Sequence, residues 1–342
     1  MKRYVFTAIL ATFISSISVA QTYVFMMKNA EGKWGYANVK GEIVIPPQYE
    51  NCDPFAENGL AVIVKDKVFT IINTKGQAIP TDVQKYEDAA SKKFNDDLFA
   101  IKVNDKCGYL NGSGKLAIPL KYDDVSDFNG GFAVAKTGSK YVVLDTKGTE
   151  TPIMQNGLVD VKHFSEGFAP VKTADKLLGF INTKGEIVVK PQFKNVGYFY
   201  GGLAWAKTMD DKAGFINSKG EWVIQPTFDA VSDFDPASMV ARVKEVDKWL
   251  YIDATGKKIY VNDTEVWGDF SDGLSKGTQA GKSGFYNTKG EWVIKPQFEG
   301  VRDFKNGYAA AKLGSKWGII DTTGKWVVQP IYDGIRDAEL IK

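Results

Sequence analysis

One glycine-centred motif recurs along nearly the whole chain, and this periodicity constrains the fold more than any other feature. The stretch WGIIDTTGKWVVQP (317–330) has counterparts that share an Asn or Asp, two further residues and a glycine. Successive glycines lie 34 to 38 residues apart, and a phenylalanine recurs between them at the same period. Two markers with one period predict nine copies of a repeat of about 35 residues that fill residues 21–342. The turn glycines are Gly41, Gly76, Gly114, Gly148, Gly185, Gly220, Gly256, Gly290 and Gly324.

Each copy has the pattern of short antiparallel strands. In one copy, GYAAAK (307–312), WGIID (317–321) and WVVQP (326–330) are β-rich segments separated by turns. The Asn or Asp of the motif caps its turn, and the glycine takes the positive φ that other residues avoid. No stretch keeps the apolar spacing of a helix over three turns. The sequence therefore predicts an all-β chain of antiparallel β-meander repeats.

A proline follows the third strand segment in six copies. We expect it to end that strand, because proline cannot donate to a β-ladder. The copies around Gly76, Gly148 and Gly256 lack this Pro-x-aromatic piece. The prolines are Pro46, Pro119, Pro191, Pro226, Pro296 and Pro330.

A single repeat is too small to bury enough apolar surface by itself, so each repeat is expected to pack its aromatic face on its neighbours. An open, twisted, solenoid-like array is the favoured arrangement, because closed propellers usually have 4–8 blades. A β-propeller-like closed ring is the alternative.

The residues KWG (33–35 and 316–318), followed by I-D/N-x-x-G-K/E-x-V-I and P-x-Y/F-D, resemble the WG repeat, also called the KWG repeat, of bacterial proteins. The resemblance covers roughly residues 22 to 337. The tryptophan of the motif is kept at Trp34, Trp249 and Trp317, and other residues replace it elsewhere. The resemblance implies an exported or surface-associated repeat module that binds a partner, and it implies no catalytic residues.

The first twenty residues have the pattern of a secretory signal peptide. Lys2 and Arg3 precede an apolar run, and Ser18-Val19-Ala20 is a small-x-small cleavage site. The apolar run is too short for a membrane-spanning helix of about 20 residues. We therefore expect cleavage after Ala20, no membrane span in the mature chain, and a location in the periplasm, on the cell surface or outside the cell.

The charge balance argues against nucleic acid as a partner. The chain has 43 Lys and Arg residues and 41 Asp and Glu residues, and without Lys2 and Arg3 the two totals are equal. The charges alternate along the chain, whereas proteins that bind nucleic acids usually have a basic face.

The sequence offers no cofactor, no metal site and no clear catalytic group. His163 is the one histidine, and it occupies the place of an aspartate in other copies. Cys52 and Cys107 are expected to be unpaired and partly buried, with a disulfide as the alternative. Two series of aspartates recur, and we expect both to cap turns. They are Asp145, Asp253 and Asp321, and Asp127, Asp233, Asp269 and Asp303.

Two further series could contact a partner. Trp222, Trp292 and Trp326 share one position in the third strand; core packing is the favoured interpretation, and an exposed row that binds sugar or protein is the alternative. A lysine also follows the apolar segment of each copy, either as a track for an anionic ligand or, as we favour, as a solvated row paired with aspartates. These lysines are Lys65, Lys102, Lys136, Lys172, Lys207, Lys244, Lys276 and Lys312.

These features favour an exported, non-enzymatic scaffold that binds a protein or a glycan. The alternative is a carbohydrate hydrolase that uses carboxylates of one irregular repeat. An enzyme would gather its unusual residues into one pocket, and this arrangement distinguishes the two hypotheses.

Overall fold

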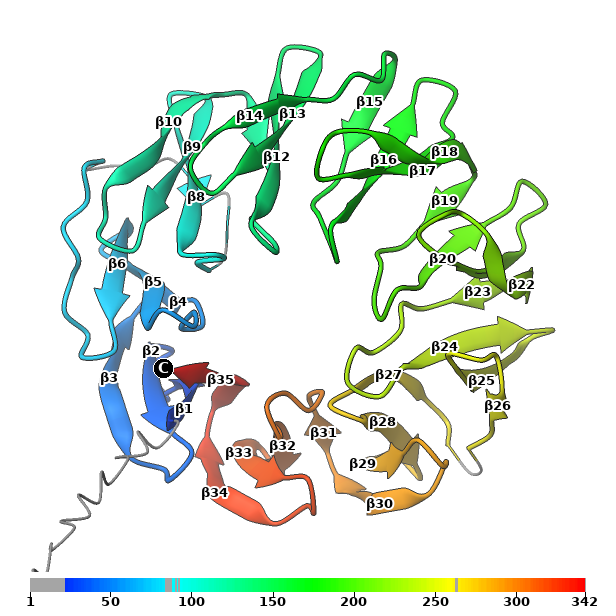
Figure 1. The fold of residues 1–342 in the computed structure, drawn as a ribbon. Coiled ribbons are helices and arrows are strands. Elements are labelled where there is room, and N and C mark those ends of the chain that lie inside the picture. The colour runs from blue at the N-terminus through cyan, green and yellow to red at the C-terminus, as the bar shows by residue number, and fades with distance from the viewer. Residues whose placement is uncertain (1–21, 84–87, 90, 92, 262–263, 342) are drawn as a thin grey trace, which may run out of the picture.

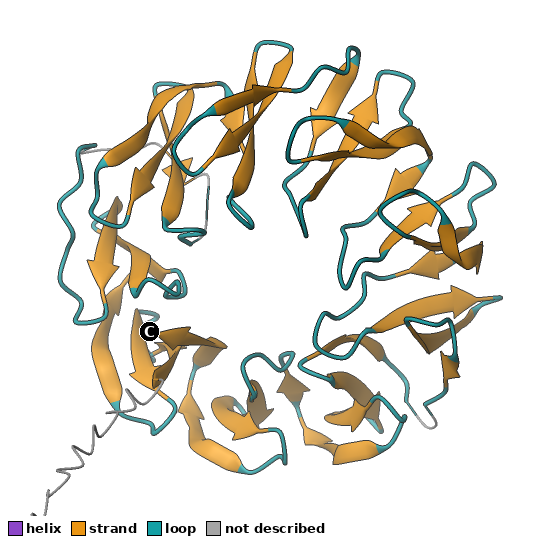
Figure 2. Ribbon diagram, in the orientation of Figure 1, coloured by secondary structure: helices purple, strands orange, loops and turns teal. Residues whose placement is uncertain are grey.

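The chain forms a ring of nine blades, as the computed structural model shows (Figure 1). The structure describes residues 22–83, 88–89, 91, 93–261 and 264–341. Within these residues every regular element is a β-strand, and adjacent strands of each blade are antiparallel (Figure 2). The all-β prediction is thus confirmed. The expected signal peptide, residues 1–20, lies outside the described residues.

Each sheet extends from a strand at the inner edge of the ring to a strand at its outer edge (Figure 1), and the first four blades have the following strands in that order. Blade 1 contains β35 (Gly334–Ile341), β1 (Thr22–Lys28), β2 (Trp34–Asn38) and β3 (Ile43–Tyr49). Blade 2 contains β4 (Asn51–Cys52), β5 (Leu60–Lys65) and β6 (Val68–Asn73). Blade 3 contains β7 (Asp88–Ala89), β8 (Leu98–Val103), β9 (Lys106–Asn111) and β10 (Leu116–Tyr122). Blade 4 contains β11 (Asp124–Val125), β12 (Phe132–Thr137), β13 (Lys140–Asp145) and β14 (Glu150–Pro152).

The other five blades repeat the same order. Blade 5 contains β15 (Leu158–Val161), β16 (Phe168–Thr173), β17 (Leu178–Asn182) and β18 (Ile187–Phe193). Blade 6 contains β19 (Asn195–Val196), β20 (Ala204–Lys207), β21 (Ala213–Ile216) and β22 (Trp222–Phe228). Blade 7 contains β23 (Ala230–Val231), β24 (Val240–Glu245), β25 (Lys248–Asp253) and β26 (Lys258–Ile259). Blade 8 contains β27 (Trp267–Ser271), β28 (Leu274–Gln279), β29 (Lys282–Asn287) and β30 (Trp292–Phe298). Blade 9 contains β31 (Gly300–Val301), β32 (Tyr308–Leu313), β33 (Lys316–Asp321) and β34 (Trp326–Tyr332).

The ring closes because the two ends of the chain share blade 1. Strand β35 pairs with β1 in an antiparallel register that runs from Thr22↔Ile341 to Lys28↔Gly334. The favoured open array is therefore wrong, and the alternative closed ring is confirmed. The sequence shows that the junctions are equivalent, but it does not show that nine successive rotations add up to a full turn.

Hydrophobic side chains pack between blades rather than inside them. The described residues contain nine hydrophobic clusters, and each joins two neighbouring blades. At the closing junction, Phe25 and Ala37 of blade 1 pack with Ile319 and Val328 of blade 9. The repeat thus buries its apolar surface on its neighbours, as the sequence predicts.

The phenylalanine that marks each repeat supplies one side of these junctions. Phe55 of blade 2 is 1% exposed, and its ring centroid lies 4.6 Å from that of Tyr36 in blade 1. The Tyr36 hydroxyl also donates to the carbonyl of Asp53 at 2.7 Å. Tyr109 makes the equivalent contacts with Phe128 and with the carbonyl of Ser126. Aromatic packing and a hydrogen bond therefore fix the same junction.

The turn motif forms as predicted. The side chain of Asn182 accepts hydrogen bonds from the amides of Lys184 and Glu186, and Gly185 has a φ of 73°. A residue with a Cβ is strained at this φ, which explains the recurring glycine.

The proline does not end the outer strand. Strand β34 continues through Pro330 to Tyr332, and the register between β33 and β34 shifts at this place. The expectation that these prolines terminate the strand is therefore wrong. The irregular pairing removes the need for an amide donor, so the strand tolerates proline.

Candidate functional site

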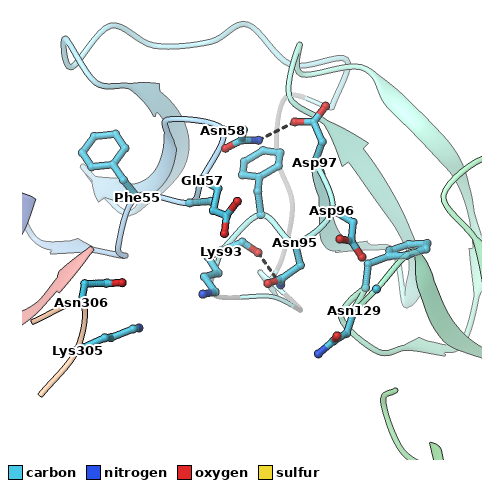
Figure 3. A pocket seen from close by; sticks show the side chains of 14 residues that line it. Phe55, Glu57, Asn58, Lys93, Asn95, Asp96, Asp97, Asn129, Lys305 and Asn306 are labelled. Atoms are coloured by element: carbon cyan, nitrogen blue, oxygen red, sulfur yellow. Dashed lines mark hydrogen bonds between the residues drawn. The ribbon is translucent and has the colours of Figure 1, made fainter. Parts of the chain in front are cut away.

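The turns between the first two strands of most blades point toward the centre of the ring (Figure 1). Those of blades 2, 3, 4 and 9 line a cavity of about 670 Å³, which we call the inner-turn pocket. Figure 3 shows that Lys93, Asn129 and Lys305 reach it from different sides. The pocket therefore combines charged and amide groups that come from blades far apart in the sequence.

Carboxylates of the inner turns link one blade to the next. Each accepts hydrogen bonds from backbone amides of the following turn, so its negative charge is partly balanced by amide dipoles. The contacts are Asp96 with Gly131 at 2.8 Å, Glu166 with Gly201 at 2.7 Å and Gly202 at 2.8 Å, and Asp272 with Gly307 at 2.8 Å.

Two other polar side chains of the inner-turn pocket have no such structural task. Asp97 accepts a hydrogen bond from the Asn58 amide at 2.7 Å, whereas the side chains of Lys93 and Asn129 make no hydrogen bond or ion pair with the described residues. An ammonium group and a side-chain amide are thus available to a ligand that enters the pocket.

A second polar region lies where blades 6 to 9 meet near their inner edges. The second strand of each of blades 6, 7 and 8 contributes one large side chain, and each contacts an aspartate of the next blade. The three contacts form what we call the wall strip. It contains Trp205 with Asp233, Arg242 with Asp269 at 3.0 Å, and Lys276 with Asp303 at 3.0 Å.

Two glycines in or directly after the adjacent inner strand make room for the wall strip. A Cβ atom on Gly197 would lie 2.1 Å from Nε1 of Trp205 and 2.3 Å from Oδ1 of Asp233. A Cβ atom on Gly268 would lie 2.6 Å from Cγ of Lys276. Both glycines are therefore required by the large side chains beside them.

The wall strip borders a cavity of about 560 Å³ between blades 6, 7 and 8, which we call the wall pocket. Tyr200, Trp205, Asp233 and Asp269 form part of its wall. Burial raises the pKa of Asp233, and hydrogen bonds from the Tyr198 amide and Trp205 act against this shift. The pocket thus contains a carboxylate held by uncharged donors beside one that is paired with a guanidinium.

The second series of aspartates therefore does not cap turns, contrary to our expectation. Asp145 of the first series does accept hydrogen bonds from the amides of Lys147 and Thr149. Asp233, Asp269 and Asp303 instead contact side chains of the preceding blade. The two series differ because the second precedes the buried phenylalanine, far from the glycine turn.

Trp222, Trp292 and Trp326 begin the outer strands β22, β30 and β34 at the rim of the ring (Figure 1). All three are half-buried. Each packs edge-to-face on another ring: Trp222 on Phe193 (centroids 5.6 Å apart), Trp292 on Tyr286 (5.3 Å) and Trp326 on Phe298 (5.5 Å). The rings thus make packing contacts and also keep part of their surface at the rim.

His163 and the two cysteines are not members of the wall strip. The His163 ring stacks on Tyr198 at 4.1 Å, and its Nδ1 lies 3.0 Å from the Tyr198 hydroxyl. Burial lowers the pKa of His163, which favours the neutral imidazole. Cys52 and Cys107 are free, as expected, and they are buried rather than partly buried.

The recurring lysines are not all equivalent. Lys102 pairs with Asp105 at 3.1 Å and Lys244 with Asp247 at 3.4 Å, so these two lysines form ion pairs, but with aspartates outside the two recurring series. Lys276, however, aligns with Phe285 in the hairpin of blade 8, whereas Lys312 aligns with Trp317 in that of blade 9. The pairing register of its hairpin therefore places Lys276 in the wall strip. This register cannot be recognised in the linear sequence, where Lys276 aligns with the other lysines.

Neither a metal-binding cluster nor a membrane-spanning helix occurs in the described part of the chain. No group of three or more His, Cys, Asp or Glu side chains there is placed to hold a metal ion. None of its regular elements is a helix of the length and apolar character needed to cross a bilayer.

Nine antiparallel blades closed by the pairing of β1 with β35 define a nine-bladed β-propeller. The chain belongs to the family of proteins with the WG-containing repeat. The repeat pattern of this family matches residues 34–68, 108–141, 179–212, 214–249, 284–317 and 317–339. These matches begin at the WG position of blades 1, 3, 5, 6, 8 and 9, which are the blades that have the Pro-x-aromatic piece.

Solved structures resemble this chain in fold. A crystal structure of the eukaryotic initiation factor has a TM-score of 0.64 at 11% identity, over 93% of this chain and 98% of that chain. BamB from Moraxella catarrhalis has a TM-score of 0.42 at 11% identity, over 80% of this chain and 94% of that chain. No curated protein sequence matches the chain. The comparison with the initiation factor supports the propeller fold alone.

Proposed function

We propose that this propeller is an exported, non-enzymatic scaffold of the cell envelope or exterior that binds a protein partner at the inner-turn pocket. The observation that carries the proposal is the pocket itself. Four blades supply ammonium, carboxylate and amide groups to one cavity of about 670 Å³. Two of these side chains, Lys93 and Asn129, make no hydrogen bond or ion pair with the described residues.

Such a mixture suits the polar part of a protein surface. Polar and charged groups at an interface select a partner and set its orientation more than they determine affinity. Carboxylate-to-amide hydrogen bonds hold several of the inner turns in fixed positions relative to the next turn. A rigid ring with several side chains pointing into its centre is therefore suited to hold a loop of another protein.

The test is affinity capture with the mature ring, residues 21–342, from an envelope extract of the source cells, followed by binding measurements with each captured protein. We expect the paired substitution Lys93→Glu and Asn129→Lys to abolish binding of the specific partner. The matched rim variants Trp222→Ala, Trp292→Ala and Trp326→Ala should retain it. Loss of binding in the rim variants alone would instead assign the partner to the tryptophans, and the absence of any partner would contradict the proposal.

Export has a separate test. The pattern of residues 1–20 supports cleavage after Ala20. Intact mass and N-terminal sequencing of the protein from the native cell fraction should then give Gln21 as the first residue. An N-terminus at Met1 would contradict cleavage.

A carbohydrate hydrolase is the second candidate, and one observation favours it. The wall pocket holds Asp233, whose pKa is raised by burial, together with Asp269, which is paired with Arg242. Glycoside hydrolysis uses two carboxyl groups in different environments, and the pKa of the acid is raised by its surroundings. Release of reducing sugar by the wild-type ring, lost in Asp233→Asn, would establish this activity and contradict the non-enzymatic assignment.

A further inference from the structure

The wall strip breaks the symmetry of the ring in three successive blades. In other blades a small or apolar residue occupies the central position of the second strand, as Ala100, Val134 and Ala310 do. In blades 6, 7 and 8 the same position holds Trp205, Arg242 and Lys276. Packing between blades does not require this change, since the other junctions pack with small or apolar residues there.

The three large side chains all contact aspartates of the following blade, so the unusual residues form one continuous region. The guanidinium of Arg242 also donates to the carbonyl of Trp267, and it lies 4.6 Å from the centroid of the Trp249 ring. These contacts fix the orientation of Arg242 toward Asp269. The wall pocket beside it therefore has rigid polar groups rather than mobile ones.

Three aspartates line the wall pocket, and each of them is already engaged by groups of the chain itself. Asp269 is already paired with Arg242 at 3.0 Å. Asp235 is 8% exposed and turns back to accept hydrogen bonds from the amide and hydroxyl of Ser238 at 2.9 and 2.6 Å. Within the described part of the chain, Asp233 has no cation beside it, and it is held by the uncharged donors Tyr198 and Trp205.

We propose that the wall pocket binds a neutral oligosaccharide, with Trp205 and Tyr200 packing on sugar rings and Asp233 and Asp269 accepting hydrogen bonds from sugar hydroxyls. Aromatic rings supply apolar contact area together with a polar edge, which matches the C–H face of a sugar ring. Carboxylates held in fixed positions accept hydrogen bonds from hydroxyl groups with high directional selectivity. A volume of about 560 Å³ is within the range of ligand pockets.

This inference goes beyond the proposed protein partner and does not depend on it. The inner-turn pocket and the wall pocket share no lining residue. A sugar can therefore bind whether or not the inner-turn pocket captures a protein, and failure of one proposal leaves the other intact.

The experiment is isothermal titration of the mature ring with maltotetraose, cellotetraose, chitotetraose and, as the basic probe, tetra-arginine. We expect at least one sugar to bind. Trp205→Ala and Asp233→Asn should each weaken that binding about tenfold or more, because each removes a contact made in the pocket. The matched controls are Trp222→Ala at the rim and Asp127→Asn, which lies at the corresponding position of blade 4; both should bind as the wild type does.

Folding is checked by circular dichroism, and Asp233→Asn keeps the shape of the side chain if Trp205→Ala fails to fold. Three outcomes would overturn the proposal. The first is that none of the three sugars binds. The second is that the sugar binds Asp233→Asn as tightly as it binds the wild type. The third is that tetra-arginine binds at Trp205 while the sugars do not.

Discussion

Gly318 and Val328 lie on neighbouring strands that approach so closely that a Cβ atom on Gly318 would be 2.5 Å from the Val328 carbonyl oxygen. The same relationship holds between Gly35 and Ile45 and between Gly284 and Ile294. In blades 2, 4 and 7, which lack the Pro-x-aromatic piece, the corresponding position holds Thr70, Val142 and Leu250. The glycine of the WG motif is thus needed where the outer strand crosses over it.

This contact predicts that Gly318→Ala destabilises the ring by about 1–3 kcal/mol, because the added methyl group overlaps backbone atoms that cannot move freely. The matched control is Gly300→Ala in the same blade, where the nearest atom to a Cβ would be 3.7 Å away. Chemical denaturation of both variants measures the difference. Equal stability of the two variants would contradict the role assigned to the WG glycine.

Closure of the ring predicts that substitution of Ile335 by alanine lowers the free energy of unfolding strongly, and that the same substitution of Ile331 lowers it only slightly. Ile335 of β35 is 1% exposed at the closing junction, whereas Ile331 of β34 is 63% exposed. Ile335→Ala should cost about 2–5 kcal/mol of unfolding free energy, and Ile331→Ala should cost less than about 0.5 kcal/mol. Thermal unfolding of both variants tests this, and a stable Ile335→Ala ring would show that β35 does not hold the ring closed.

The link between inner turns predicts that Glu166→Ala weakens the junction of blades 5 and 6. Its carboxylate accepts hydrogen bonds from Gly201 and Gly202, and such bonds to a charged acceptor contribute about 1 kcal/mol at an exposed site. Glu31→Ala, in an exposed turn, is the control and should leave the melting temperature unchanged. Indistinguishable melting curves for the two variants would mean that the link adds no stability.

Burial predicts slow reaction of both thiols in the native ring. Burial raises the pKa of Cys52 to about 12, and it also raises the pKa of Cys107. Only the thiolate is nucleophilic, so a disulfide reagent at pH 8 should modify neither residue quickly until denaturant is added. Fast modification of the native ring, assigned with Cys52→Ser and Cys107→Ser, would contradict this prediction.

The raised pKa of Asp233 predicts a pH-dependent contribution to stability. A carboxyl whose pKa is higher in the folded state binds its proton more tightly there, so it favours folding at low pH and loses this contribution as the pH rises through the folded pKa. Asp233→Asn should therefore melt at or above the temperature of the wild type at pH 7, and the difference should decrease toward pH 4. If Asp233→Asn melted at a lower temperature than the wild type at pH 7, that result by itself would contradict a raised pKa of Asp233.

Much of the repeat could be read from the sequence. The Asn182–Gly185 turn is local, so residue type and spacing suffice to predict it. The alignment of Phe55 with Phe128 and the other marker phenylalanines also predicts that each repeat packs on the next. The course of the outer strand past Pro330 could not be predicted, because it depends on the close approach of β33 and β34.

The candidate sites were less accessible to sequence reasoning. Trp222, Trp292 and Trp326 are visible as a series because they follow the turn motif at a constant distance. The wall strip was hidden, since Lys276 aligns with the other lysines by sequence and leaves them only when hairpin register is known. Trp205 and Asp233 are 28 positions apart and meet only across a blade junction.

The sequence by itself determined the β-repeat, its period, its turns and its need for neighbours, because these follow from contacts within about one repeat. Only the tertiary structure decided that nine repeats close into a ring through β1 and β35, and that side chains of different blades share two pockets. Closure depends on the sum of nine small rotations, and a local pattern constrains each rotation too weakly to fix their sum.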